Sequence, residues 1–220
     1  NNGDDLAINA NSTSFTFATA LASGSTYAVT VASQPNRLAC NITNNNGTVA
    51  STNISNVNIT CITPVYMANF ISNTVSMFMM DSTTGILSPL STPSVATGNT
   101  PYSITVNPAG TFAYVTNQGD NTVSMYAINA STGILTPLIT PTVNTFRPYS
   151  VAINPAGTFA YVTNSTRNTV SMYSIDATTG ILTPLTTPTV TTPGSAISIA
   201  INPSGTCLLY TSPSPRDVEE

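Results

Sequence analysis

The side chains that could take part in chemistry are few in this chain. Only 5% of the residues are charged, compared with about 25% in an average soluble domain, and the sequence contains no histidine and no lysine. Three charged residues, Asp120, Arg147 and Arg167, lie in loop-like segments, and Phe146 directly precedes Arg147. Charged and aromatic side chains in loops often contact ligands. We therefore predict ligand contacts at Asp120, Phe146, Arg147 and Arg167, with Phe146 and Arg147 as the best contact pair.

The common catalytic arrangements are missing from the sequence. It has no histidine to act as a base or bind a metal, no Gly-x-Ser-x-Gly motif, and no carboxylates paired at a useful spacing. Asp81 and Asp176 lie in turn-like segments, where aspartate commonly organises the backbone. Ser103 and Ser150 lack a base, and we interpret them as structural. We therefore expect no catalytic residue, no metal and no cofactor.

Two of the three cysteines favour a disulfide. Cys40 and Cys61 are 21 residues apart, in strand-like segments separated by the turn signal Asn-Asn-Asn-Gly. A bridge between them would stabilise the fold by roughly 3 kcal/mol and would place the protein outside the reducing cytosol, in the extracellular space or on the cell surface. The alternative is a pair of buried free thiols. The first residues, NNGDDLAINA, contain no signal peptide.

The elements that position these residues follow from a repeat. From about residue 64 onward the sequence repeats with a period of 47–48 residues. Asn-Pro, Asn-Thr-Val-Ser-Met and Thr-Gly-Ile-Leu recur in the same order in each period. Their landmark residues are Asn107, Asn154 and Asn202; Asn73, Asn121 and Asn168; and Gly85, Gly133 and Gly180. Such regular spacing indicates duplication of one structural unit.

Each period reads as four short strands, which we name A to D. Strand A covers 102–106, where apolar and polar residues alternate; FAYVT forms B, NTVSMYAI forms C and ILTPLITPTV forms D. Pro137 and Pro141 would interrupt a central strand, so D is expected at the edge of its sheet. Four antiparallel strands in 40–50 residues describe a blade of a β-propeller, so the fold class is all-β.

Consecutive strands of a blade run between the two faces of a propeller, which separates the loops into two sets. The A–B and C–D turns lie on the first face, and their sequences hardly change between copies. The B–C and D–A loops lie on the second face, where QGD at 118–120 becomes STR at 165–167 and ATGNT at 96–100 becomes VNTFR at 143–147. The second face is therefore where we expect a ligand. An equally good explanation is that these loop sequences vary because nothing constrains them.

Several motifs carry a family resemblance. The Tyr-Val-Thr-Asn segments at 114–117 and 161–164, followed by NTVSMY and TGIL, resemble the bacterial YVTN-type propellers, which are related to the lactonase-family seven-bladed propellers. The resemblance covers residues 64–206. It implies a propeller, and it suggests hydrolysis of sugar lactones, as in 6-phosphogluconolactonase-like proteins, as one activity. A shared fold does not by itself establish a function.

The repeat also predicts the domain organisation. Residues 1–62 contain short strand-like segments and are expected to form a small β-sandwich-like domain. They resemble a repeated domain of secreted bacterial proteins, and this resemblance implies that the chain starts inside that domain. Residues 64–206 are expected to form an incomplete propeller. Its blades would be blade 1, which lacks strand A, at 64–95; blade 2 at 101–143; blade 3 at 148–190; and the start of blade 4 at 195–206. We expect a longer chain to supply the strand and the blades that close the ring.

The third copy of the repeat changes abruptly after Thr206. The eleven residues CLLYTSPSPRD, at 207–217, resemble the translation of a sequencing adapter, and they begin where FAYVTN is expected. We therefore predict that residues 207–220 are not native. A divergent last strand followed by a Pro-Ser tail is the alternative. Without Cys207 the cysteine count becomes even.

Two functions are compatible with these observations. Low charge, the predicted disulfide and the missing catalytic groups favour a secreted or cell-surface propeller that binds a protein or carbohydrate ligand, or serves as a structural module, without catalysis. Hydrolysis of sugar lactones is the alternative. Nucleic acid is excluded as a partner because the four arginines are scattered along a chain with a net charge of −4. No apolar run is long enough to span a membrane.

Overall fold

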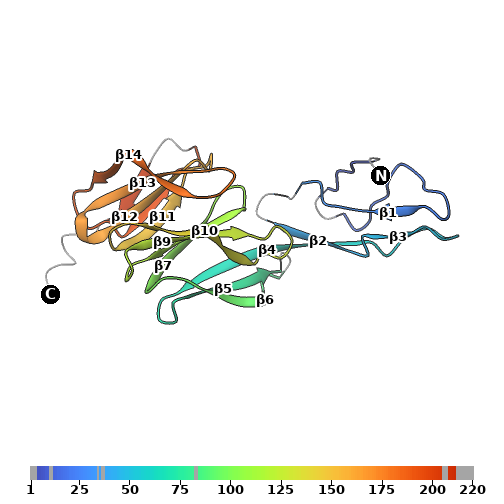
Figure 1. Ribbon diagram of the computed structural model, residues 1–220, viewed down its shortest axis with the longest axis horizontal. Coiled ribbons are helices and arrows are strands. Elements are labelled where there is room, and N and C mark those ends of the chain that lie inside the picture. Colours follow the sequence, from blue (N-terminus) through green and yellow to red (C-terminus); the bar gives the residue numbers. More distant parts are fainter. Residues whose placement is uncertain are drawn as a thin grey trace.

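The computed structural model describes residues 4–9, 12–33, 35, 38–81, 84–204 and the backbone of 208–211. Within these residues the chain is built from β-strands and one short 3₁₀ turn, η1 (Ser165–Arg167). An elongated N-terminal part leads into a group of packed four-stranded sheets (Figure 1). In the described part of the chain no helix is long and apolar enough to cross a membrane.

Two sheets are complete blades. Both are antiparallel throughout, and the last strand in sequence lies at one edge while the first lies at the other. This confirms the four-strand unit and the edge position of strand D. In strand D of blade 2 the ladder shifts register between Pro137 and Thr142, next to Pro141. Blade 2 consists of β7 (Pro101–Val106), β8 (Phe112–Asn117), β9 (Thr122–Ile128) and β10 (Leu135–Asn144), and blade 3 of β11 (Pro148–Ile153), β12 (Phe159–Asn164), β13 (Thr169–Ile175) and β14 (Leu182–Thr191).

Blade 1 joins the N-terminal part to the propeller through one long strand. The first half of β4 (Asn58–Asn69) pairs with β2 (Ala39–Thr43), and its second half pairs with β5 (Thr74–Met80), followed by β6 (Leu87–Ala96). Among the described residues no strand lies at the position of strand A beside the second half of β4. The start of blade 1 at strand B stays a prediction, with which this arrangement is consistent.

The N-terminal part contains the predicted disulfide. Cys40 of β2 lies directly opposite Cys61 of β4, with the two Cα atoms 3.9 Å apart, and the sulfurs are bonded. A separate two-stranded ladder joins β1 (Thr26–Ala28) and β3 (Asn46–Thr48). The β-sandwich-like organisation of residues 1–62 and its boundary with the propeller stay predictions.

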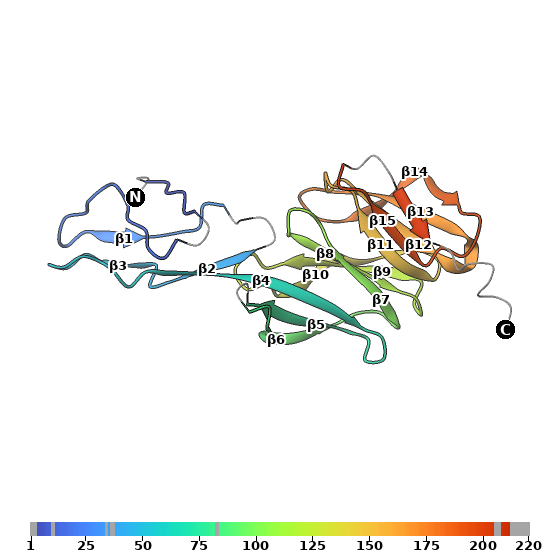
Figure 2. The ribbon, with the colours of Figure 1, turned by 180° about the vertical axis from the view of Figure 1, so that it is seen from behind.

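The inner strands of successive blades lie side by side. In Figure 2, β7, β11 and β15 (Ser198–Ile201) follow one another, and β15 starts the fourth blade. Its partner β16 (Leu208–Thr211) belongs to the segment for which the sequence predicts a non-native origin. Cys207 and residues 212–220 lie outside the described residues, so that hypothesis stays a prediction.

The core of the propeller lies between the blades. Strand β8 is buried on both faces, which is consistent with the unbroken apolar run at its residues 112–115. Its Ala113 and Val115 pack against blade 1, while Phe112 and Tyr114 pack against blade 3. Tyr114, Met77 and Met125, which recur with the repeat, are thus fully buried core residues at the blade interfaces.

A hydrogen bond between strand B and the next blade repeats around the arc. The hydroxyl of Tyr66 donates to the carbonyl of Gly133 at 2.6 Å, and that of Tyr114 donates to the carbonyl of Gly180 at 2.8 Å. Burial raises the pKa of both tyrosines well above 10, so both stay neutral donors. The Thr-Gly-Ile-Leu turn of one blade and strand B of the preceding blade therefore contact each other. Phe112 adds a close contact, because a β-carbon on Gly180 would overlap its ring.

Candidate functional site

The loops of the second face are held by the last residue of strand B. The side chain of Asn117 is fully buried, and its Oδ1 accepts a 3.0 Å hydrogen bond from the Thr97 hydroxyl in the preceding D–A loop. Asn164 accepts the equivalent bond from Thr145 at 2.8 Å. This pairing explains why the Tyr-Val-Thr-Asn segment ends in asparagine: its amide positions the loops that carry the candidate site.

A second asparagine sets the backbone where each D–A loop enters strand A. Asn121 adopts a left-handed conformation (φ 57°), and its Oδ1 accepts a 2.9 Å hydrogen bond from the backbone N–H of Arg147. Arg147 itself has φ 41°. The same bond joins Asn73 to Thr100, whose φ is 50°. Positive φ is unfavourable for arginine and threonine, so these bonds hold a costly backbone geometry at a repeated position.

Between these anchors a D–A loop and the following B–C loop together form a slot. The first slot is formed by residues 96–100 and 118–120 and the second by residues 143–147 and 165–167, and the two slots contain different side chains. In the first copy both oxygens of Asp120 accept hydrogen bonds from Asn99, one from its backbone N–H and one from its side-chain amide, each at 2.7 Å. In the second copy the guanidinium of Arg167 lies 3.4 Å from the centre of the Phe146 ring. A carboxylate–amide clamp is thus replaced by a cation stacked on an aromatic ring.

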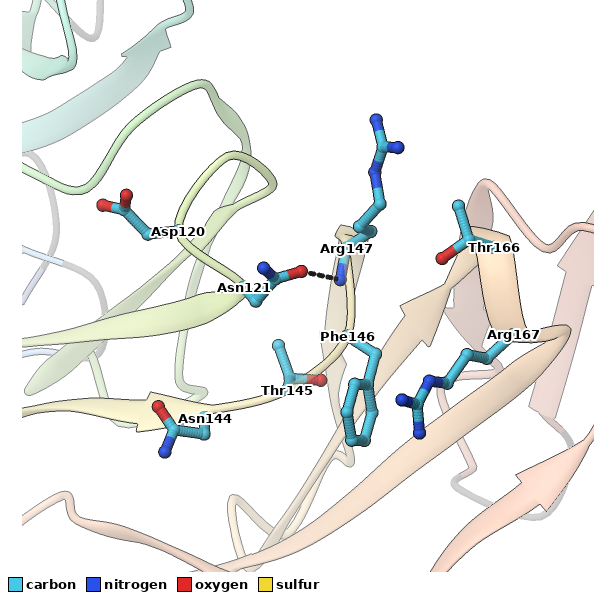
Figure 3. A pocket seen from close by; sticks show the side chains of 8 residues that line it. All are labelled: Asp120, Asn121, Asn144, Thr145, Phe146, Arg147, Thr166 and Arg167. Carbon is cyan, nitrogen blue, oxygen red and sulfur yellow. Dashed lines mark hydrogen bonds between the residues drawn. The ribbon is translucent and has the colours of Figure 1, made fainter.

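The second slot opens into a depression of about 630 Å³. Figure 3 shows Phe146 and Arg167 side by side, Arg147 pointing away from them, and Asp120 on the neighbouring loop facing the other way. Phe146 remains 40% exposed, so part of its ring is accessible to a ligand. The lining residues are Asp120, Asn121, Asn144, Thr145, Phe146, Arg147, Thr166 and Arg167.

The four residues predicted from the sequence therefore line one depression, but with an unexpected division of roles. Phe146 stacks on Arg167 of the next blade and not on its neighbour Arg147. Both carboxylate oxygens of Asp120 accept hydrogen bonds from Asn99, so this carboxylate stabilises the loop. Their role as ligand contacts stays a proposal. Among the described residues no three acidic, cysteine or histidine side chains gather where they could hold a metal ion.

Sequence reasoning overlooked a row of aromatic side chains beside this depression. Tyr102 and Tyr149 occupy the second position of strand A in blades 2 and 3, with ring centres 4.4 Å apart, and Phe70 lies 5.2 Å from Tyr102. The repeated Pro-Tyr-Ser could have indicated it. A tyrosine at a fixed position of each inner strand must form a row once the inner strands lie side by side.

A comparison with known families decides the relationship of the chain. The family model described as Lactonase, 7-bladed beta-propeller, matches residues 61–199. The chain belongs to this family. The match covers blades 1 to 3 and ends in β15, and it leaves almost all of the N-terminal part outside.

Solved structures place this lactonase-family propeller among proteins of the same fold. The periplasmic gluconolactonase of Pseudomonas aeruginosa is 18% identical, with a TM-score of 0.57 over 67% of this chain and 43% of that protein. A candidate 6-phosphogluconolactonase of Bacteroides fragilis is 23% identical, with a TM-score of 0.54 over 63% of this chain and 41% of that protein. The chain thus spans less than half the length of either. No match was found among the curated proteins.

Proposed function

We propose that the protein is a hydrolase of sugar lactones, and that its ligand site is the depression around Phe146, Arg147 and Arg167. Membership of the lactonase family supports a hydrolase over a non-catalytic propeller. The sequence alone favoured the non-catalytic propeller, so the preference is reversed. The observation that carries the proposal is the exchange of the Asn99–Asp120 clamp for the Phe146–Arg167 pair. Of the two slots compared among the described residues, the second therefore holds a guanidinium beside an accessible ring. The activity belongs to the whole protein, of which this arc supplies one part.

The chemistry that this pair supports is stabilisation of negative charge. In lactone hydrolysis, water adds to the ester carbonyl carbon and the carbonyl oxygen becomes negatively charged. The bond from that carbon to the ring oxygen then breaks, and the ring oxygen takes up a proton to give a hydroxy acid. The N–H groups of a guanidinium can donate to the charged oxygen and later to the carboxylate of the product. The ring of Phe146 holds the Arg167 guanidinium in place and shields one of its faces from water.

A binding site without turnover is the second candidate, and Asp120 favours it. Hydrolysis at neutral pH needs a group that accepts a proton from the attacking water. Asp120 is the acidic side chain that lines the depression, and both its oxygens already accept hydrogen bonds from Asn99. In that case the depression would bind the sugar acid and release it unchanged.

Hydrolysis of glucono-δ-lactone separates these functions. Proton release is followed at mildly acidic pH, where spontaneous hydrolysis is slow, and binding of gluconate is measured in parallel. Removing a donor to the developing oxyanion costs about 10²-fold in kcat, so Arg167→Ala is expected to lose turnover and to weaken gluconate binding. Asp176→Asn is the matched control, because Asp176 lies in a C–D turn on the other face, where it accepts from the backbone of Thr178 and Thr179.

Each outcome selects one function. Turnover that depends on Arg167 supports the hydrolase. Gluconate binding that is lost in Arg167→Ala, without turnover above the spontaneous rate, identifies a binding module. Turnover unchanged by Arg167→Ala moves the active site elsewhere, and absence of both turnover and binding refutes the proposed site.

A further inference from the structure

The aromatic row beside the depression is exposed although its rings touch one another. Tyr102 is 43% exposed and Phe70 is 46% exposed. The Phe70 and Tyr102 rings meet edge to face at 81°, and the Tyr102 and Tyr149 rings are inclined at 41°. Packing between the rings fixes their positions, while more than two fifths of the surface of Tyr102 and of Phe70 stays in water. An ordered, solvent-exposed aromatic surface is a common feature of binding sites.

The row lies on the same face as the depression and nearer to the centre of the arc. Tyr102 and Tyr149 belong to the inner strands β7 and β11, at the end where the D–A loops enter them. Residue 149 follows Arg147 by two positions along an extended chain, which places the two backbones about 7 Å apart. The hydroxyl of Thr116 donates to the carbonyl of Tyr149 at 3.0 Å, so this part of the row is anchored to blade 2.

The row is amphipathic and is joined to the depression by Arg147. A hydrogen bond with the Tyr149 hydroxyl raises the pKa of Tyr102, and the positive charge of Arg147 acts in the opposite direction. Arg147 thus lies close enough to influence the Tyr102 hydroxyl, and it is also one of the residues that line the depression. Figure 3 shows its guanidinium directed away from the Phe146–Arg167 pair. The surface therefore presents ring faces, phenol hydroxyls and a cation in continuous order.

We propose that the Phe70–Tyr102–Tyr149 row holds a second sugar ring, so that the preferred ligand is an aldonic acid or aldonolactone that carries a glycosyl group. This inference rests on the proposed function, because it assigns the acid or lactone end to the Phe146–Arg167 pair. The C–H face of a pyranose stacks on the exposed ring of Tyr102 or Phe70, and its hydroxyl groups bond with the tyrosine hydroxyls and with Arg147.

A proline-rich peptide is the main competitor for such a surface, since it too binds between tyrosine rings. Arg147 favours the sugar acid. The Arg167 guanidinium lies at the end of the row, where it would meet the carboxylate or ester of the same ligand, and the Arg147 guanidinium would meet the hydroxyl groups of the second sugar ring. A neutral peptide would leave both cations without a partner.

The test measures binding of gluconate and of cellobionate, which is gluconate carrying one glucosyl group, by titration calorimetry. The unmodified protein is expected to bind cellobionate about tenfold more tightly, a typical contribution of one ring stacked on an aromatic side chain. Tyr102→Ala is expected to remove this preference and leave gluconate binding unchanged. Tyr102→Phe keeps the ring and should retain most of the preference. Tyr27→Ala, in the N-terminal part, is the matched control and should retain all of it.

The outcomes distinguish this inference from the function on which it rests. Equal binding of the two sugars by the unmodified protein, with gluconate binding still dependent on Arg167, overturns the second sugar site and leaves the lactone site intact. A cellobionate preference that survives Tyr102→Ala places the glucosyl group elsewhere and also overturns it. If neither sugar binds, both ideas fail. Binding of a proline-rich peptide that is lost in Tyr102→Ala, without sugar binding, assigns the row to a peptide.

Discussion

The glycine of the Thr-Gly-Ile-Leu turn has two roles, and a pair of variants separates them. Gly85 and Gly180 have nearly the same backbone, with φ of 72° and 73°. A β-carbon at Gly85 would meet no atom within 4 Å, whereas one at Gly180 would overlap the ring of Phe112 in the neighbouring blade. Alanine at both positions pays the same backbone cost, so the difference between them measures the contact between blades.

The magnitudes follow from these two terms. Alanine in the left-handed region costs about 1–2 kcal/mol, and this is the whole loss in unfolding free energy expected for Gly85→Ala. Forcing a methyl group into a packed interface adds about 1–3 kcal/mol, so Gly180→Ala is expected to lose about 2–5 kcal/mol. In a chain of this size each kcal/mol lowers the melting temperature by about 2–4 °C. The melting temperature of Gly180→Ala should therefore lie several degrees below that of Gly85→Ala.

Urea unfolding followed by far-ultraviolet circular dichroism provides the free energies. Phe112→Leu is combined with Gly180→Ala as a test of the contact, because a smaller side chain should recover part of the loss in the double variant. Equal losses for Gly85→Ala and Gly180→Ala, with no coupling to residue 112, would refute the close approach of the turn to the preceding blade.

Three further predictions follow, two on the same interfaces and one on the N-terminal part. Tyr114→Phe removes the donor to a buried carbonyl and should lower the free energy of unfolding in urea by about 1–3 kcal/mol. The Tyr161 hydroxyl has no hydrogen bond within the described residues, so Tyr161→Phe should lower it by less than about 0.5 kcal/mol. Equal losses would argue against the bond. Burial raises the pKa values of Tyr66 and Tyr114, so the stability they confer is complete below their ordinary pKa of 10.0 and is lost as pH rises above it. Replacing both with phenylalanine should flatten the alkaline part of a stability–pH curve, and an unchanged slope would contradict this. Reducing the Cys40–Cys61 bridge should cost roughly 3 kcal/mol and make β2 susceptible to protease before the blades, which mass spectrometry of early fragments would reveal or disprove.

Much of the fold was predictable because each blade is defined by local patterns. Alternation in strand A, the turn residues Asn107 and Gly110, and prolines in strand D each act within a few residues, and duplication repeats the same signals in register. The disulfide was predictable for a similar reason, since Cys40 and Cys61 belong to strand-like segments flanking one turn signal. The candidate site was predictable only as a set of variable loop residues. Their partners were not.

Local sequence patterns are sufficient to define the blade, its strand order and the loops that differ between copies, because hydrophobic alternation and turn chemistry act over short distances. The residues that meet across a blade boundary become known only when the sheets are packed against each other. Tyr114 reaches Gly180 across 66 positions, Phe146 stacks on Arg167 and not on Arg147, and Asp120 is bound by Asn99. These pairings depend on how one twisted sheet stacks on the next and on the positive φ angles at which the loops enter strand A. No residue type alone encodes that stacking.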